Sequence, residues 1–237
     1  MSTPTIKVVP GANLAEEAAE VVIAAADQAI GQRGSFTLAL SGGSTPKVLY
    51  ELLASDACRN RIDWPKWEIY FGDERTVPPD HPDSNYRMAN EAMLSKVQIP
   101  ADHVHRMKGE IDPNPAAIEY GRMLKERFGD GGLDLILLGM GDDGHTASLF
   151  PGSEALEEKK HRVVANWVEK FKTWRITMTA PFINKARQVL VIVGGASKAG
   201  RVAEVLEGPR DPHRLPIQMI EPAGELIWLM DTAGAGM

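Results

Sequence analysis

Residues Leu135-Ile-Leu-Leu-Gly-Met-Gly-Asp-Asp-Gly-His-Thr-Ala-Ser-Leu-Phe-Pro151 change abruptly from an apolar to a polar segment. The apolar run 133–138 is too short for a buried helix and predicts a central strand that is covered on both faces. In an α/β sheet, ligands bind beyond the carboxyl ends of the strands. The polar residues that follow are therefore expected at the edge of a ligand-binding cleft.

This polar segment combines backbone freedom with titratable side chains. Its glycines, which allow sharp turns and a close approach to a ligand, alternate with carboxylates and an imidazole: Gly139, Gly141, Gly144, Asp142, Asp143 and His145. His145 is a candidate general base. The same residues are also common in ordinary turns, where a single histidine has a structural role. We expect residues 146–150 to begin a short helix that Pro151 ends.

A second strand, turn and helix lie nearer the N-terminus. Apolar residues 36–40 predict a strand that runs into Ser41-Gly-Gly-Ser-Thr-Pro46, and residues 47–54 have a helical pattern. Backbone N–H groups at such a helix start can hold a phosphate, and the candidate contacts are Gly42, Gly43, Ser44 and Thr45. An ordinary tight turn is the alternative. Nucleotide binding is disfavoured, because neither the P-loop spacing nor a third glycine of a dinucleotide fingerprint is present.

Polar residues also follow the strand predicted over 67–71. The sequence continues as Gly72-Asp-Glu-Arg-Thr76, which contributes Asp73 and Arg75 as candidate site residues. Polar groups thus follow three predicted strands where each one ends. Three such segments are harder to explain as ordinary turns than a single one would be.

A fourth predicted strand, 189–193, ends in a glycine turn and a helix with Lys198 near its start. A lysine at a helix start opposes the helix dipole, which favours a bound anion there, although a solvated lysine is the alternative. Arg175 begins an alternating strand over 175–180 and is a further candidate. The sheet is therefore expected to gather a phosphate-binding region and an acid/base group in one cleft, which indicates a small phosphorylated metabolite as the ligand.

Length and composition set the class of protein. The 237 residues, with 43% hydrophobic and 24% charged residues, predict one α/β domain over 1–237 with a mostly parallel, Rossmann-like sheet and helices on both faces. A net charge of -6 argues against nonspecific nucleic-acid binding. No stretch is long and apolar enough for a membrane span, and no signal peptide is evident. The single cysteine, Cys58, excludes an internal disulfide, so a cytoplasmic location is expected. His81 lies in no recognised metal-binding pattern.

Two helix starts are predicted from capping signals. Asn13-Leu-Ala-Glu16 has the layout of a capping box, and the helix that follows should end at Gly31 to Gly34. Asn114-Pro115 predicts an N-cap followed by proline in the first helical position.

Four motifs in order give the chain a specific resemblance. They are Leu40-Ser-Gly-Gly-Ser-Thr-Pro46, Gly72-Asp-Glu-Arg75 with Asp80-His-Pro-Asp-Ser-Asn-Tyr86, Gly139-Met-Gly-Asp-Asp-Gly-His-Thr-Ala-Ser-Leu-Phe-Pro151, and Arg175-Ile-Thr-Met-Thr179. Over nearly its whole length the chain resembles the 6-phosphogluconolactonase family, within the group that includes glucosamine-6-phosphate deaminase/isomerase. Lys198 follows the strand after which this group places a phosphate-binding lysine.

The resemblance implies hydrolysis of 6-phospho-D-glucono-1,5-lactone to 6-phospho-D-gluconate in the oxidative pentose phosphate pathway, without a cofactor or metal. His145 would take a proton from the attacking water and Asp143 would orient the imidazole. The candidate phosphate or sugar contacts, together with the glycine turn at Gly42 and Gly43, are Ser44, Thr45, Asp73, Arg75, Arg175 and Lys198. The sequence leaves the oligomeric state open.

Three functions other than lactone hydrolysis are disfavoured by the sequence. The deaminase relatives carry a glutamate five positions after the corresponding histidine, where this chain has Phe150. An apolar ring cannot relay a proton, so the difference disfavours the isomerase or deaminase reaction. A non-catalytic sugar-phosphate sensor would need a DNA-binding segment, and the first strand begins too early in this sequence to leave room for one. A serine hydrolase is disfavoured by the lack of a Gly-x-Ser-x-Gly elbow.

Overall fold

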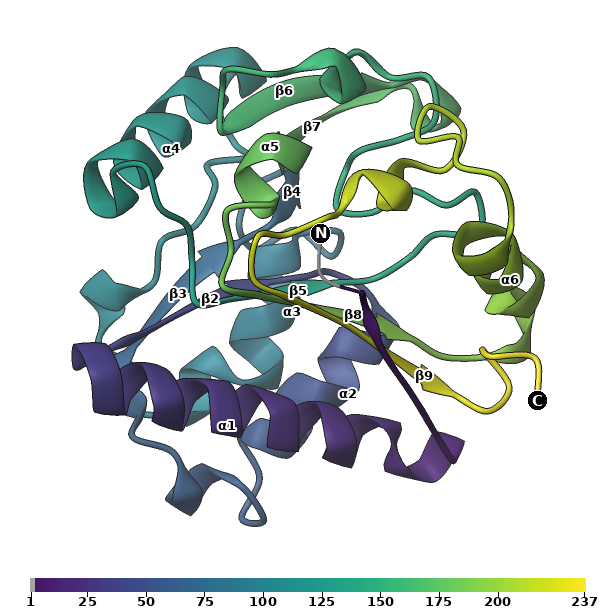
Figure 1. The fold of residues 1–237 in the computed structure, drawn as a ribbon. Helices are drawn as coiled ribbons and strands as arrows, with labels where there is room; N and C mark the ends of the chain where they lie inside the picture. Colours follow the sequence, from purple (N-terminus) through teal and green to yellow (C-terminus); the bar gives the residue numbers. More distant parts are fainter. Residues whose placement is uncertain (1–2) are drawn as a thin grey trace.

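A six-stranded parallel sheet forms the centre of the structure, a computed structural model that describes residues 3–237 (Figure 1). Its strand order is β1-β9-β8-β5-β2-β3. The strands are β1 (Thr5–Val9), β2 (Phe36–Leu40), β3 (Trp67–Phe71), β5 (Leu135–Leu138), β8 (Gln188–Val193) and β9 (Glu225–Asp231). Every residue of β2 and β5 is buried, as expected for strands covered on both faces. The predicted α/β fold is confirmed.

The direction in which the chain builds this sheet reverses between β2 and β5. From β2 the chain moves outward to β3, whereas from β5 it moves the other way, to β8 and then β9. Ligands of doubly wound sheets bind at such a switch point, beyond the carboxyl ends of the strands. The two glycine-rich segments of the sequence, 41–46 and 139–145, leave the sheet from these two neighbouring strands.

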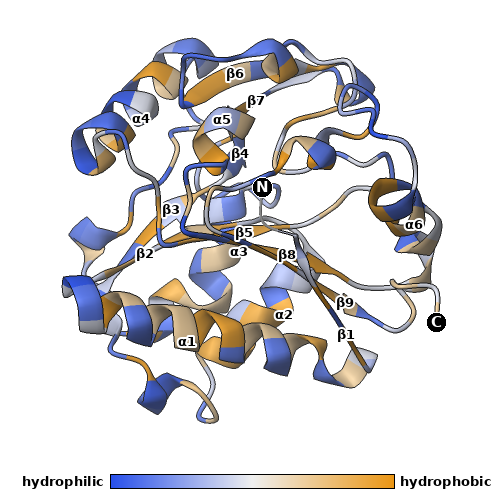
Figure 2. Cartoon of the chain, viewed as in Figure 1, coloured by the Kyte–Doolittle hydropathy of each residue, from blue (hydrophilic) through white to orange (hydrophobic). Residues whose placement is uncertain are grey.

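Helices cover the sheet on both sides. The helices are α1 (Leu14–Arg33), α2 (Ser44–Leu53), α3 (Asn85–Ala92), α4 (Pro113–Phe128), α5 (Ala180–Ile183) and α6 (Ala199–Glu207). Figure 1 shows α1, α2 and α3 on one side and α4 and α5 on the other. The central strands are the most continuously hydrophobic layer in Figure 2, consistent with a core on both faces of the sheet. No helix within residues 3–237 is long and apolar enough to cross a membrane.

A second, smaller sheet lies on the same side as α4, and it contains the strand predicted over 175–180, which begins and ends two residues earlier in the structure. It is antiparallel, with the order β4-β7-β6, and consists of β4 (Asp73–Arg75), β6 (Val163–Val168) and β7 (Thr173–Met178). The tripeptide β4 is too short to show alternation, so the motif 72–76 was interpreted only as a polar loop. Its pairing with β7 places Arg75 directly opposite Arg175.

Both capping predictions need correction. The side chain of Asn13 makes no capping hydrogen bond, because Gly11–Asn13 is already a turn of 3₁₀-helix that leads into α1. This helix passes through Gly31 and ends at Gly34, whose φ of 84° is the left-handed conformation that glycine favours. Helix α4 begins two residues earlier than predicted, since Asp112 accepts a hydrogen bond from the N–H of Asn114 and Pro113 takes the first helical position.

The turn after β2 is held in place by a tyrosine from α2. The hydroxyl of Tyr50 donates to the carbonyl of Ser41 at 2.8 Å and accepts from the N–H of the same residue at 2.9 Å. Tyr50 is completely buried. One side chain therefore satisfies both backbone groups of a residue at the switch point.

Replacing this hydroxyl tests its contribution to the turn. Tyr50→Phe leaves a buried N–H and a buried C=O without a partner, so we expect the free energy of unfolding to fall by about 1–3 kcal/mol. Urea unfolding at neutral pH measures it. Tyr86→Phe is the matched control, because the Tyr86 hydroxyl makes no hydrogen bond to the described residues 3–237. An equal loss in the two variants would contradict the assigned role.

Candidate active site

His145 and Asp143 form a hydrogen-bonded pair in the loop after β5. Nδ1 of His145 lies 2.5 Å from Oδ1 of Asp143, and the backbone N–H of His145 donates to the same oxygen at 3.2 Å. Both side chains are one-quarter exposed. An ionised carboxylate has no proton to donate, so Nδ1 carries the shared proton, and in the neutral imidazole Nε2 is then the nitrogen with a free lone pair. The two residues predicted to act together are thus in hydrogen-bond contact, and their catalytic roles stay a prediction.

The pair depends on glycine at position 141. A Cβ atom there would lie 2.0 Å from Nδ1 of His145 and 2.9 Å from Oδ1 of Asp143, inside the hydrogen bond itself. The N–H of Gly141 also donates to the carbonyl of His145 at 2.9 Å, which closes the loop on itself. Gly144 has a φ of 81°, a conformation that favours glycine. The glycines of this motif thus provide space for the functional side chains.

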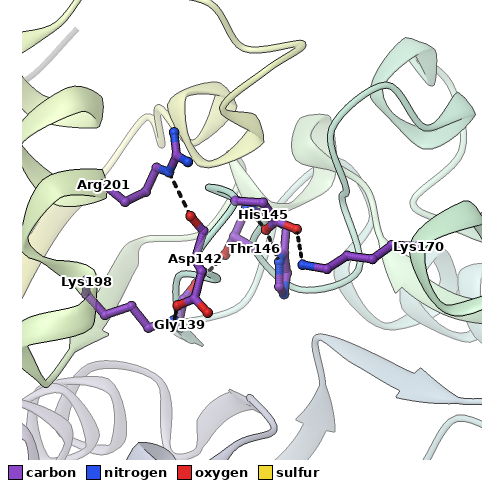
Figure 3. Close-up of polar contacts among 8 residues, drawn as sticks. Gly139, Asp142, His145, Thr146, Lys170, Lys198 and Arg201 are labelled. Atoms are coloured by element: carbon purple, nitrogen blue, oxygen red, sulfur yellow. Dashed lines mark hydrogen bonds and ion pairs between the residues drawn. The ribbon is translucent and has the colours of Figure 1, made fainter.

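Asp143 is held in its charged form. Burial alone would raise the pKa of this carboxyl, but hydrogen bonds from Lys170 and His145 hold it well below the usual range. Nζ of Lys170 lies 2.8 Å from Oδ2 of Asp143 (Figure 3). A carboxylate that stays ionised can stabilise an imidazolium on its neighbour.

The segment after His145 is a tight turn, so the predicted helix over 146–150 is wrong. Thr146 and Leu149 form a β-bridge, and Ala147 adopts a φ of 48°. Tertiary hydrogen bonds explain the difference, because Ser148 donates from its hydroxyl to Asp73 at 2.6 Å and from its N–H to Thr177 at 3.2 Å. The turn also brings the ring of Phe150 onto His145, with centroids 4.0 Å apart.

Asp73 is buried, and each of its two carboxylate oxygens accepts a hydrogen bond. Its Oδ2 accepts from Ser148, and its Oδ1 accepts from Asn85 at 3.1 Å. Asn85 begins α3 and also reaches the backbone carbonyl of Asp73 at 3.0 Å. A Cβ atom on Gly42 would lie 2.0 Å from Oδ1 of Asn85. The first glycine turn, Asp73 and the turn after His145 are therefore connected through two polar side chains.

Arg75 and Arg175 stand side by side on paired strands. Directly opposed residues of an antiparallel pair project to the same face. The Nε atoms of both are buried and have no hydrogen-bond partner among the described residues 3–237. Burial and the neighbouring charge of Arg75 lower the pKa of Arg175. Two adjacent guanidinium groups with unused donors are suited to an anion.

Ser44 and Thr45 begin α2, three residues before the helix predicted over 47–54. The first N–H groups of a helix have no partner within the helix and can bind an anion. Gly43 precedes them with a φ of 110°, which favours glycine. Ser44 and Thr45 line a cavity of about 280 Å³ together with residues that include Gly194. Asp143 and Phe150 line a different cavity, so one continuous cleft remains a prediction.

Lys198 reaches the same loop from the far side. Its ammonium forms an ion pair with the exposed carboxylate of Asp142, and Arg201 donates to the backbone carbonyl of Asp142 at 2.8 Å (Figure 3). The hydrogen bond from the Lys198 ammonium to the Asp142 carboxylate is the main reason why the pKa of Asp142 is lowered. The lysine lies just before α6, with its charge directed toward the loop after β5.

The sequence did not point to Lys170, which contacts Asp143 from a hairpin loop. Nothing in the local sequence distinguishes it from the other charged residues of that loop. Only the pairing of β6 with β7 brings Lys170 beside Asp143, which lies 27 positions earlier in the chain. The sequence distinguishes Phe150 only because the deaminase relatives have a glutamate at this position. Its stacking on His145 results from the turn and is visible only in the structure.

The chain is similar to a set of known proteins over nearly its whole length. A family described as glucosamine-6-phosphate isomerases/6-phosphogluconolactonase matches residues 11–228. A 6-phosphogluconolactonase of Nostoc sp. is 43% identical, covering 97% of this chain and 96% of the relative, and one of Synechocystis sp. is 45% identical, covering 92% and 91%. The structure of 6-phosphogluconolactonase from Trypanosoma brucei is 30% identical with a TM-score of 0.88, covering 100% of this chain and 99% of that one.

The ionised state of Asp143 predicts a pH-dependent contribution to stability. A carboxyl whose pKa is lowered by folding stabilises the protein above its unfolded value of about 3.9, and this contribution is lost as the pH falls further. The difference in unfolding free energy between the wild type and Asp143→Asn should therefore shrink as the pH falls below about 4. Urea unfolding across this range measures it.

Asp27→Asn serves as the control, since Asp27 is an exposed residue of α1 and its removal changes the net charge equally. The same pH profile for both differences would mean that Asp143 is not specially stabilised in its charged form.

Proposed function

The chain belongs to the glucosamine-6-phosphate isomerase/6-phosphogluconolactonase family, and we propose that it hydrolyses 6-phospho-D-glucono-1,5-lactone to 6-phospho-D-gluconate in the oxidative pentose phosphate pathway. The relatives that match it along almost their full length are named 6-phosphogluconolactonase. The observation that carries the proposal is the hydrogen bond from Nδ1 of His145 to Asp143. It leaves Nε2 as a base of the kind that ester hydrolysis needs.

In the proposed reaction, Nε2 of His145 removes a proton from water as the water oxygen attacks C1 of the lactone. The carbonyl oxygen becomes an oxyanion, and the imidazolium is stabilised by the charge of Asp143. Collapse of the intermediate breaks the bond between C1 and the ring oxygen. His145 then returns its proton to that oxygen, so the imidazole is regenerated. The product is the open-chain acid, which ionises in water.

Donors for the oxyanion and phosphate are available on neighbouring elements. N–H groups at the start of α2, with the hydroxyls of Ser44 and Thr45, are suited to bind an anion. Arg75 and Arg175 form a second group of donors, and their unpartnered Nε atoms support a role in substrate binding. Lys198 can exchange the exposed carboxylate of Asp142 for a substrate phosphate. We assign Asp73 to a sugar hydroxyl.

A deaminase or isomerase reaction on an amino sugar phosphate is the second candidate, because the matching family includes glucosamine-6-phosphate isomerases. The stacking of Phe150 on His145 disfavours it, since the ring occupies the imidazole face with a group that cannot transfer protons. Ammonia release from glucosamine 6-phosphate would support this second activity. We also propose a cytoplasmic location, which fits a single buried cysteine without a disulfide partner.

Removal of the base is the principal test of the proposed function. His145→Ala should lower kcat for the phosphorylated lactone by about 10²–10⁴-fold, because a general base contributes that much to catalysis. The measurement follows the disappearance of freshly generated lactone at near-neutral pH, with spontaneous hydrolysis subtracted. His213→Ala, which removes an exposed histidine next to Glu157, should keep wild-type activity. Full turnover by the His145 variant would refute the assignment.

Substitution of Lys198 tests the proposed phosphate contact. Lys198→Met should raise KM for the phosphorylated lactone by about tenfold or more, the loss expected for a charge-assisted hydrogen bond, while kcat changes little. Activity on the unphosphorylated lactone should be unaffected. Lys66→Met removes a lysine before β3, at the opposite end of that strand from the site, and controls for the lost charge. An unchanged KM in Lys198→Met would exclude this lysine from substrate binding.

A further inference from the structure

The loop between β6 and β7 lies against the proposed catalytic pair. This loop, residues Glu169–Lys172, is here called the hairpin tip. Its Lys170 extends from a different part of the chain toward the loop that carries His145, as Figure 3 shows. Among the described residues 3–237, the ammonium makes its ion pair with Asp143, at 2.8 Å.

The two oxygens of Asp143 are divided between two partners. Oδ1 faces the ring and backbone nitrogens of His145, whereas Oδ2 faces Lys170. Rotation of the carboxylate about its last bond would break both contacts together. Lys170 therefore restricts the last torsion angle of the Asp143 side chain, which sets the plane of the carboxylate.

Aromatic contacts hold the hairpin tip in this position. The ring of Phe171 packs edge-on against Phe150, with centroids 5.7 Å apart, and Phe150 is stacked on His145. The guanidinium of Arg175 lies 5.6 Å from the centre of the Phe171 ring. The tip thus contacts one member of the pair through an ammonium and the other through a stack of two rings.

We propose that Lys170 is a positioning residue that fixes Asp143 in the orientation required by His145. This inference rests on the proposed function, in which His145 is the base. An ion pair with a half-exposed lysine contributes little to global stability, so its effect is expected in the geometry of the pair. Lys170 would act through Asp143 without touching the substrate.

The experiment compares three variants of the full-length protein. Lys170→Met should lower kcat for the phosphorylated lactone about tenfold, a part of the ~10²–10⁴-fold that a general base contributes, with KM unchanged within about twofold. Lys170→Arg should restore most of the rate, because it keeps the charge. Lys172→Met should behave as wild type, since this neighbouring lysine pairs with Glu169.

Coupling to Asp143 separates positioning from a general loss of structure. In an Asp143→Asn background, Lys170→Met should cause no further loss of kcat. An equal loss in both backgrounds, a wild-type kcat in Lys170→Met, or a higher KM with unchanged kcat would each overturn the inference.

A measurement without substrate keeps the inference separate from the proposed function. The NMR signal of the His145 Nδ1 proton reports its hydrogen bond to Asp143, and it should broaden or move in Lys170→Met but not in Lys172→Met. An unchanged signal would overturn the positioning role. A wild-type protein without lactonase activity would refute the proposed function, and the NMR result would still decide the role of Lys170.

Discussion

The parallel pairing of β2 with β5 is the constraint on which the rest of the site depends. Because the chain builds the sheet outward in opposite directions from these strands, no crossover helix of the described residues 3–237 fills the space above their carboxyl ends. Two glycine-rich turns occupy that space. One begins α2 and provides unpaired N–H groups, and the other carries the imidazole and its carboxylate. The polar chemistry of the molecule therefore follows from the connectivity of an apolar sheet.

Much of the fold could be predicted because it depends on patterns of neighbouring residues in the sequence. The apolar runs of β2 and β5 are short, uninterrupted and followed by glycine, which is sufficient to place both strands and to locate His145 at the site. The strands of the large sheet could therefore be predicted without knowing which distant segments they contact. The start of α2 is located less well, because the helical pattern predicts 47–54 whereas the helix begins at Ser44, directly after a glycine with a positive φ.

What could not be predicted depends on contacts between distant segments. The strand β4 has three residues and exists because β7 pairs with it, so Arg75 and Arg175 meet only in the folded chain. The segment 146–150 has a sequence compatible with a helix, but hydrogen bonds from Ser148 to Asp73 and Thr177 hold it in a turn. Lys170 belongs to the same class, because its partner lies in another loop. Local propensity is overridden where tertiary hydrogen bonds are available.

The register of β7 has a consequence for how this chain can tolerate insertions and deletions. This strand carries Arg175 opposite Arg75, and the loop immediately before it carries Lys170 beside Asp143. Successive residues of a strand face opposite sides, so a shift by one position would turn Arg175 away from its neighbour and displace the hairpin tip as well. Length changes in this hairpin would therefore disturb two parts of the site at once.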